Sequence, residues 1–267
     1  MRLLLPRLHL FEFEDLAWCP RAVRDGLTDY LEFVLGSFAP YHVLLPRLAE
    51  AIEATPATRI VDLGAGAGGP WRRLLPDLCC RTERPLSLLL TDLYPHSKAA
   101  APANLGVGVD YWPDPVDARE VPGILVGFRT QFGGFHHFEP ADARRVLQDA
   151  VRSGQGIAIA EITERRLLTA LRMVVVPFAI LVGAPFMRPI RWERLFWTYL
   201  VPVIPAVALV DAIVSCLRSY TAAELLAMAR EAGHGDYEWQ AGRELSPEAL
   251  LPVTWLIGHP ARRSTSP

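Results

Sequence analysis

A glycine-rich turn between a predicted strand and a predicted helix constrains the fold of this chain more than any other feature. Apolar β-formers lead into an acidic residue and then into Gly64-Ala65-Gly66-Ala67-Gly68-Gly69. Pro70 follows, and a residue without an N–H suits the first turn of a helix. Glycines let the backbone approach a ligand closely, and a helix N-terminus presents unpaired N–H groups. The turn therefore predicts a site for a nucleotide-like ligand.

Strands alternate with helices along most of the chain. Seven segments have the composition of strands: 59–63, 86–90, 107–111, 124–128, 156–162, 236–241 and 251–258. A helix before the last two strands begins at a capping box formed by Thr221 and Glu224. Alternation of this kind predicts an α/β fold with a Rossmann-like, doubly wound, seven-stranded sheet.

The regions around this core define the expected domain organisation. A chain of 267 residues suits one elaborated α/β domain. We expect a helical N-terminal cap at 1–58, a cofactor-binding core at 59–165, an apolar helical insertion or lid after strand five at 166–219, completion of the core at 220–260 and a tail at 261–267.

Charge and cysteine content narrow the function classes. The formal net charge of −2 excludes a general nucleic-acid-binding field, so no nucleic-acid partner is expected. Pro6 and Arg7 interrupt the apolar start of the chain, which lacks the core of a secretory leader. The cysteines, none in a Cys-x-x-Cys pair, are Cys19, Cys79, Cys80 and Cys216. We expect reduced thiols and a cytoplasmic protein, with peripheral membrane association as an alternative.

Two cofactor classes fit the glycine turn. Gly64, Gly66 and Gly69 satisfy the G-x-G-x-x-G pattern of dinucleotide sites, and Asp92 lies near the position of their ribose-binding acid. That pattern predicts an NAD(P)-dependent oxidoreductase. The same turn, with Asp62 two residues before its first glycine, resembles the first motif of class I S-adenosylmethionine-dependent methyltransferases. The third hypothesis is that the turn binds no ligand.

Further segments resemble the methyltransferase family, in the family's order. Asp92-Leu93 closes the second strand, where the family's acid binds both ribose hydroxyls. Asp117-Ala118 follows the third strand, where an acid–small pair contacts the adenine. The helix at 221–233 resembles the one before the family's closing strands. The resemblance covers residues 41–258 and implies S-adenosyl-L-methionine as the cofactor. In architecture the chain is similar to the small-molecule methyltransferases of ubiquinone and menaquinone biosynthesis.

The resemblance implies a set of cofactor-binding residues. Asp92 offers two acceptor oxygens to vicinal hydroxyls, and Asp117 is alternatively a solvated loop acid. Tyr41 or His42 is placed to reach the methionine carboxylate. The full predicted set is Asp62, Gly64, Ala65, Gly66, Asp92, Leu93, Asp117, Ala118 and Tyr41.

Two adjacent histidines follow the fourth strand, where this fold brings substrate and methyl group together. A neutral imidazole can accept a proton from a methylated atom, so His136 and His137 are the catalytic candidates. We expect them to point in different directions, so that only one faces the substrate. Alternatively, one histidine caps the next helix while the other is a packing residue. Methyl transfer would then proceed without a general base. No metal site is predicted, because His136, His137 and Glu139 lack the spacing of helical ligands.

The insertion contains two charge-free runs, 173–187 and 195–210, separated by Arg188, Arg191 and Arg194. Each run is about 15 residues, against about 20 needed to span a bilayer, so we do not expect it to span. Four readings stay open: a lid over an apolar substrate, a peripheral membrane contact through 171–210 with the arginines at the headgroups, a homodimer interface, or ordinary core.

The predicted function is methyl transfer from S-adenosylmethionine to O, N or C of a small hydrophobic acceptor, which includes prenylated or lipid-like molecules. A non-methylating protein that binds the cofactor or docks to a membrane on the same fold is the alternative from another class.

Overall fold

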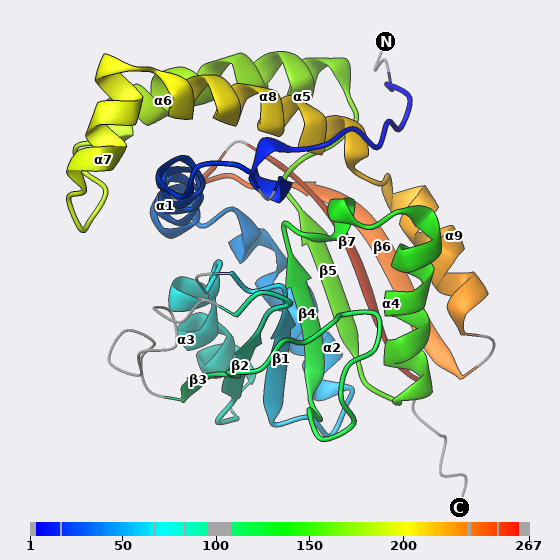
Figure 1. Ribbon diagram of the computed structural model, residues 1–267. Coiled ribbons are helices and arrows are strands. Elements are labelled where there is room, and N and C mark those ends of the chain that lie inside the picture. The colour runs from blue at the N-terminus through cyan, green and yellow to red at the C-terminus, as the bar shows by residue number, and fades with distance from the viewer. Residues whose placement is uncertain are drawn as a thin grey trace, which may run out of the picture. The chain divides into compact units, whose positions relative to one another are not determined.

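The computed structural model describes residues 4–16, 18–66, 68–82, 84–95, 108–233, 236–249 and 251–261 (Figure 1). The chain divides into two compact units. Unit 1 contains Met1–Phe38 and Thr163–Tyr220, and unit 2 contains Ala39–Ile162 and Thr221–Pro267. Residues 39–58, which we assigned to the N-terminal cap, thus group with the sheet. The alanine-rich composition of 96–104 predicts a short helix, but this segment lies outside the described residues, as do Ala67 and most of the C-terminal tail.

Unit 2 is built on one seven-stranded sheet with the order β3-β2-β1-β4-β5-β7-β6. β1 to β5 are parallel, and β7 runs antiparallel to both β5 and β6. The strands are β1 (Arg59–Leu63), β2 (Ser87–Thr91), β3 (Val109–Tyr111), β4 (Phe128–Phe132), β5 (Ile157–Glu161), β6 (Tyr237–Leu245) and β7 (Pro252–Pro260). This mixed sheet confirms the predicted fold class.

Helices cover the sheet of unit 2. α2 packs against α3, and α4 packs against α9 (Figure 1). Their bounds are η2 (Pro40–Leu44), α2 (Leu45–Glu53), α3 (Trp71–Thr82), η4 (Phe135–His137), α4 (Pro140–Arg152) and α9 (Ala222–Ala232). β1, β2 and β5 are largely buried and mostly apolar because a doubly wound sheet has helices on both faces.

The fourth strand begins four residues later than the sequence predicts. We expected it at 124–128, but Ile124 and Val126 are exposed and β4 is Phe128–Phe132. Gly127 leads into the strand beside β1, where an added Cβ would lie 2.6 Å from the carbonyl oxygen of Arg59. Only a glycine fits this close approach, so the backbone of Gly127, rather than the apolar residues before it, determines where the strand starts.

β4 buries three consecutive polar side chains, which explains why its sequence does not look like a strand. Arg129 forms an ion pair with Asp149 of α4 at 2.6 Å. The Thr130 hydroxyl donates to Asp62 of β1, also at 2.6 Å. Buried polar groups are tolerated when they are hydrogen-bonded, so these partners let a polar strand occupy the centre of the sheet.

Unit 1 combines α1 (Arg21–Phe38) with the helices that follow β5, which confirms the predicted apolar helical insertion. An added Cβ on Gly26 of α1 would lie 2.5 Å from Ile204 of α8, so these two helices cross closely. The core of the unit is formed by Cys19, Val23, Leu27, Ile180, Ile204 and Ala208. The insertion elements are α5 (Leu167–Arg172), η5 (Met173–Val175), α6 (Val176–Gly183), α7 (Trp192–Leu195), η6 (Phe196–Leu200) and α8 (Val203–Arg218).

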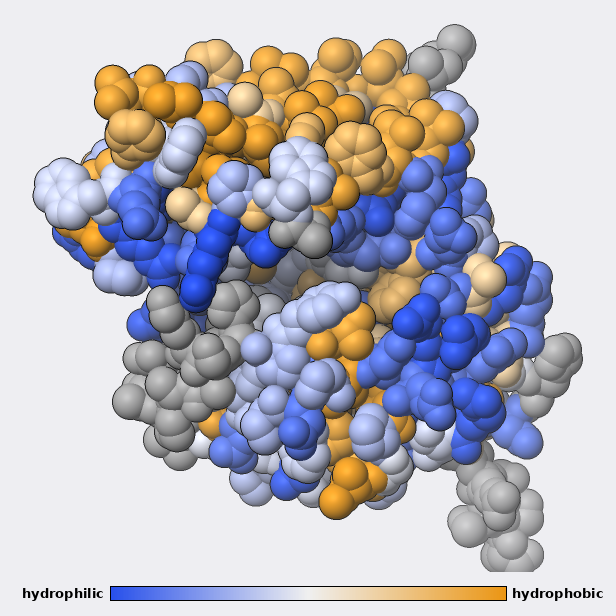
Figure 2. All heavy atoms as spheres, viewed as in Figure 1, coloured by the Kyte–Doolittle hydropathy of each residue, from blue (hydrophilic) through white to orange (hydrophobic). Residues whose placement is uncertain are grey.

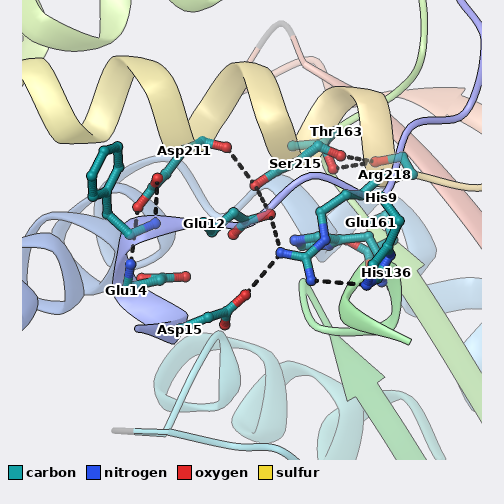
Figure 3. A network of polar contacts seen from close by, with 12 residues as sticks. His9, Glu12, Glu14, Asp15, His136, Glu161, Thr163, Asp211, Ser215 and Arg218 are labelled. Atoms are coloured by element: carbon teal, nitrogen blue, oxygen red, sulfur yellow. Dashed lines mark hydrogen bonds and ion pairs between the residues drawn. The ribbon is translucent and has the colours of Figure 1, made fainter. Parts of the chain in front are cut away.

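A buried polar network attaches the N-terminal segment of unit 1 to α8 (Figure 3). The Arg218 guanidinium pairs with Glu12 at 3.0 Å and with Asp15, in η1 (Phe13–Asp15), at 2.8 Å. Asp211 accepts the backbone N–H of Phe13 at 2.8 Å, and burial raises the pKa of its carboxyl. These contacts make the segment that contains η1 an integral part of the unit rather than a free tail.

Among the residues that the structure describes, no single helix has the length and hydropathy to cross a membrane. Trp192–Leu200 and Val203–Arg218 meet those two criteria together, and they are bent by 80° where they join.

The predicted capping box at the start of α9 is present. Thr221 Oγ1 accepts the Glu224 N–H at 3.2 Å, and the Glu224 carboxylate accepts the Thr221 N–H at 2.8 Å. Thr221→Ala should lower the free energy of unfolding by about 1 kcal/mol, because the Glu224 N–H loses its acceptor. Thr221→Ser keeps the hydroxyl and serves as the control in urea denaturation. Equal stability of the Ala and Ser variants would contradict this assignment.

Candidate functional site

The glycine turn after β1 has a backbone that other residues rarely adopt. Gly64 and Gly66 have φ values of +69° and +53°, in the left-handed region. An added Cβ at Gly66 or Gly69 would have no heavy atom within 4 Å. The Ala65 N–H donates to the carbonyl of Thr91 at 2.9 Å, which fixes the turn to the end of β2. The start of the turn is thus attached to β2, and the backbone at Gly66 and Gly69 borders open space.

Asp92, immediately after β2, lies against this turn. One carboxylate oxygen accepts the Gly66 N–H at 2.8 Å, and the other accepts the Tyr94 N–H at 2.8 Å. Each oxygen keeps a further lone pair for a ligand. Leu93 follows with a partly exposed side chain. Asp92 therefore lies next to the glycine turn, as the sequence pattern predicts.

Asp62 lies at the other side of the turn, buried near the end of β1. Burial raises the pKa of its carboxyl to about 7, while the hydrogen bond from Thr130 and a weaker interaction with the Trp71 indole favour the ionised form. The negative charge of Asp92 raises the pKa slightly further. Asp62 therefore exchanges a proton close to neutral pH.

The raised pKa of Asp62 predicts a pH dependence of stability. Its ordinary value is 3.8, so the protonated carboxyl stabilises the fold fully below that pH, and this stabilisation is lost as the pH rises through about 7. Asp62→Asn keeps an oxygen for the Thr130 hydroxyl and cannot ionise. The difference in unfolding free energy between Asp62→Asn and the unchanged protein should grow by roughly 2 kcal/mol from about pH 5 to about pH 8. Urea denaturation across this range measures it, and a constant difference would contradict the assignment.

Tyr41 and His42, offered by the sequence as alternatives, have different surroundings. The buried Tyr41 ring lies 4.8 Å from Phe132, and the charges of Glu161 and Asp62 add to burial in raising the pKa of its hydroxyl well above the ordinary value. His42 Nε2 contacts the Asp77 carboxylate of α3 at 2.9 Å. Tyr41 therefore belongs to the group of side chains at the strand ends, and His42 is engaged with α3.

Gln131 of β4 is a site residue that the sequence interpretation missed. Its Nε2 lies 3.7 Å from the position of an added Cβ on Gly64. Its Oε1 is buried and accepts no hydrogen bond from any residue that the structure describes. A buried carbonyl oxygen without a donor is rare, so a bound ligand that donates here fits the turn. The alternation of side chains along β4 identifies Gln131 only once the strand register is known.

The two histidines lie in η4, after β4, and His136 is paired with Glu161 at the end of β5 (Figure 3). Glu161 Oε1 accepts the backbone N–H groups of Phe135 and His136 at 2.7 and 3.1 Å. Glu161 Oε2 lies 2.9 Å from His136 Nδ1. A carboxylate only accepts hydrogen bonds, so this network assigns the hydrogen to Nδ1 and makes Nε2 the basic nitrogen. Glu161, like Gln131, was missed.

His137 does not point away from His136 as we expected. The two ring centroids are 4.3 Å apart and the ring planes differ by 32°, so the rings lie side by side. The expectation was wrong because it assumed an extended backbone, whereas these residues form a 3-10 turn. His136 is buried and His137 half-buried.

Asp117 is held by an arginine. Arg119 binds both carboxylate oxygens of Asp117 and reaches Asp142 of α4 at 2.8 Å. These hydrogen bonds hold the pKa of Asp117 below its ordinary value. The Val116 N–H donates to the carbonyl of Asp92 at 2.9 Å, which ties this loop to the end of β2, and Ala118 is buried. The predicted adenine contact of Asp117 and Ala118 stays a prediction.

Solved structures share this α/β fold. The chain is similar to the plantazolicin methyltransferase BpumL in complex with SAH, with 13% identity over 93% of both chains and a TM-score of 0.51. It is also similar to the citrinin polyketide synthase CMeT domain, with 17% identity over 95% of this chain and 60% of that one and a TM-score of 0.53. A third similar structure is PigF with SAH, with 14% identity over 93% of this chain and 62% of that one and a TM-score of 0.52. The chain spans about three fifths of the latter two. No family model and no curated protein sequence matches it. The fold is thus that of methyltransferases.

Proposed function

We propose that this protein transfers a methyl group from S-adenosylmethionine to O, N or C of a small hydrophobic acceptor. The observation that carries the proposal is the arrangement around the glycine turn. The Asp92 carboxylate accepts the Gly66 N–H, and the Gln131 amide group, whose Nε2 lies beside Gly64, has a carbonyl oxygen without a partner among the described residues. Together they offer acceptors on both sides of a backbone that a ligand can approach.

The residues of the turn match the polar groups of this cofactor. Asp92 is suited to accept from two vicinal ribose hydroxyls, because a carboxylate can receive two parallel hydrogen bonds. The Gln131 oxygen and Asp62 are acceptors for the donors at the amino-acid end. S-adenosylmethionine supplies an electrophilic methyl group on its sulfonium. The similarity to the plantazolicin methyltransferase BpumL and to PigF, both of which bind SAH, supports this choice of ligand.

The pair of His136 and Glu161 supplies the proton acceptor. Glu161 holds the imidazole through Nδ1 and fixes its backbone through two N–H groups. His136 Nε2 then accepts the proton that an O–H, N–H or C–H acceptor loses when it is methylated. Burial of both side chains keeps water away from this transfer.

An apolar acceptor is supported by aromatic side chains at the same strand ends. Phe132 lies 4.8 Å from the Tyr41 ring and 5.4 Å from the Trp71 ring. Tyr41 and Trp71 are buried, so of these three rings only Phe132 is partly exposed, and its apolar ring favours an aromatic or aliphatic acceptor over a charged one. Prenylated and lipid-like acceptors are the members of this class suggested by the resemblance to methyltransferases of ubiquinone and menaquinone biosynthesis.

Transfer of labelled methyl from S-adenosylmethionine to apolar phenols, hydroquinones and amines tests the proposal. Label in the organic extract that His136→Ala abolishes supports it. Binding and oxidation of NADPH without methyl transfer would instead establish the oxidoreductase reading.

A further inference from the structure

Unit 1 carries an outward apolar stripe on the helical run from α5 to α6. Figure 2 shows apolar side chains gathered over α5, α6 and α8. The stripe recurs every three or four residues, and its exposed fractions are between 59% and 70%. We refer to the following residues as the outer stripe: Leu168, Leu171, Val175, Phe178, Val182 and Phe186.

The opposite side of the same run is already used for packing. Ile180 belongs to the core formed with α1 and α8, and an added Cβ on Gly183 would lie 3.1 Å from Phe33 of α1. A surface helix ordinarily has polar residues on the side away from its core. Here both sides are apolar, so the outer stripe is a second contact surface rather than the back of a packed helix.

The charges around the outer stripe indicate what it contacts. Residues 167–210 contain four arginines and one acidic residue, although the whole chain has a net charge of −2. Arg194 is buried against Asp29, and Arg191 lies 3.5 Å from the same carboxylate. These two arginines are therefore not headgroup ligands of the kind we expected from the sequence. Arg172 and Arg188 are the exposed ones.

We propose that the outer stripe docks this protein onto the surface of an anionic phospholipid bilayer. Exposed arginines beside an apolar stripe match phosphate headgroups above acyl chains. Trp192, 81% exposed, has the amphipathic ring that such interfaces favour. A second copy of this chain fits the outer stripe less well. A two-fold interface would place the stripe and its arginines against themselves, and within 167–210 Glu193 is the one acidic residue that could pair with those arginines.

Flotation of the full chain with vesicles tests this docking surface. We expect binding to vesicles of phosphatidylcholine with phosphatidylglycerol and weaker binding to phosphatidylcholine alone. The triple variant Phe178→Gln/Val182→Gln/Phe186→Gln should bind at least about tenfold more weakly, because it removes the apolar part of the contact. Arg172→Gln/Arg188→Gln should remove the preference for phosphatidylglycerol.

A matched control separates docking from misfolding and from the proposed function. Ile124→Gln/Val126→Gln replaces two comparably exposed apolar residues of unit 2 and should leave vesicle binding unchanged. All variants should bind S-adenosylmethionine as the unchanged protein does, since none alters the glycine turn. The proposal is overturned if the chain does not float with anionic vesicles, if the triple variant floats equally well, or if the stripe instead mediates a lipid-independent dimer in sedimentation velocity.

Discussion

Asp92→Ala is expected to weaken the binding of S-adenosylmethionine and S-adenosylhomocysteine about a hundredfold. The substitution removes both acceptor oxygens beside the turn and also leaves the Gly66 N–H without its partner. Hydrogen bonds to a charged group contribute about 1.5–3 kcal/mol each, so the loss of one or two accounts for this factor. Titration calorimetry at constant salt measures it directly.

Asp110→Ala is the matched control for this experiment. Asp110 is an exposed acid on β3, the strand next to β2, and its removal changes the net charge by the same amount. It should leave the affinity unchanged. Asp92→Asn keeps one acceptor oxygen and should give an intermediate loss. If Asp92→Ala and Asp110→Ala bound the cofactor equally well, Asp92 would have no part in recognition.

Glu161→Gln should lower kcat about a thousandfold while the affinity for S-adenosylmethionine stays the same. The Gln oxygen can still accept the backbone N–H groups of Phe135 and His136, so the local fold is kept. Its amide would however donate to His136 Nδ1, which moves the hydrogen to Nε2 and removes the basic nitrogen. The corresponding carboxylate-to-amide change in a Ser-His-Asp triad costs about ten-thousandfold in kcat, through the same change of tautomer.

The matched control is Glu139→Gln, an exposed carboxylate close to η4 that should leave kcat unchanged. Glu161 acts through His136, so the acidic limb of the kcat–pH profile provides a second measurement. That limb should be present in the unchanged protein and absent from the residual activity of Glu161→Gln. A normal kcat for the Glu161→Gln variant would contradict the role of His136 as the general base.

Local patterns in the sequence predicted the sheet and the turn well. The glycine turn, the acid before it and Asp92 after β2 depend on residues close together in the chain, where spacing reflects geometry. Within the helical cap expected at 1–58, the apolar periodicity of 21–38 and the prolines on either side are local signals, and they predict the bounds of α1.

Long-range polar partners explain what was missed. Thr130 meets Asp62 from 68 residues away, and Arg194 meets Asp29 from 165 residues away. A polar strand such as β4 is stable only with such partners, and no local pattern reveals them. Gln131 and Glu161 became candidates because the sheet brings β1, β4 and β5 together. The orientation of the histidines likewise depended on a 3-10 turn rather than on their order in the sequence.

Titration calorimetry of the unchanged protein with S-adenosylhomocysteine, with NADH as the comparison ligand, tests the central claim most directly. We predict binding of one S-adenosylhomocysteine per chain with low-micromolar affinity and no heat from NADH. Absence of binding by S-adenosylhomocysteine, or tighter binding of NADH, would contradict the assignment of the glycine turn to this cofactor.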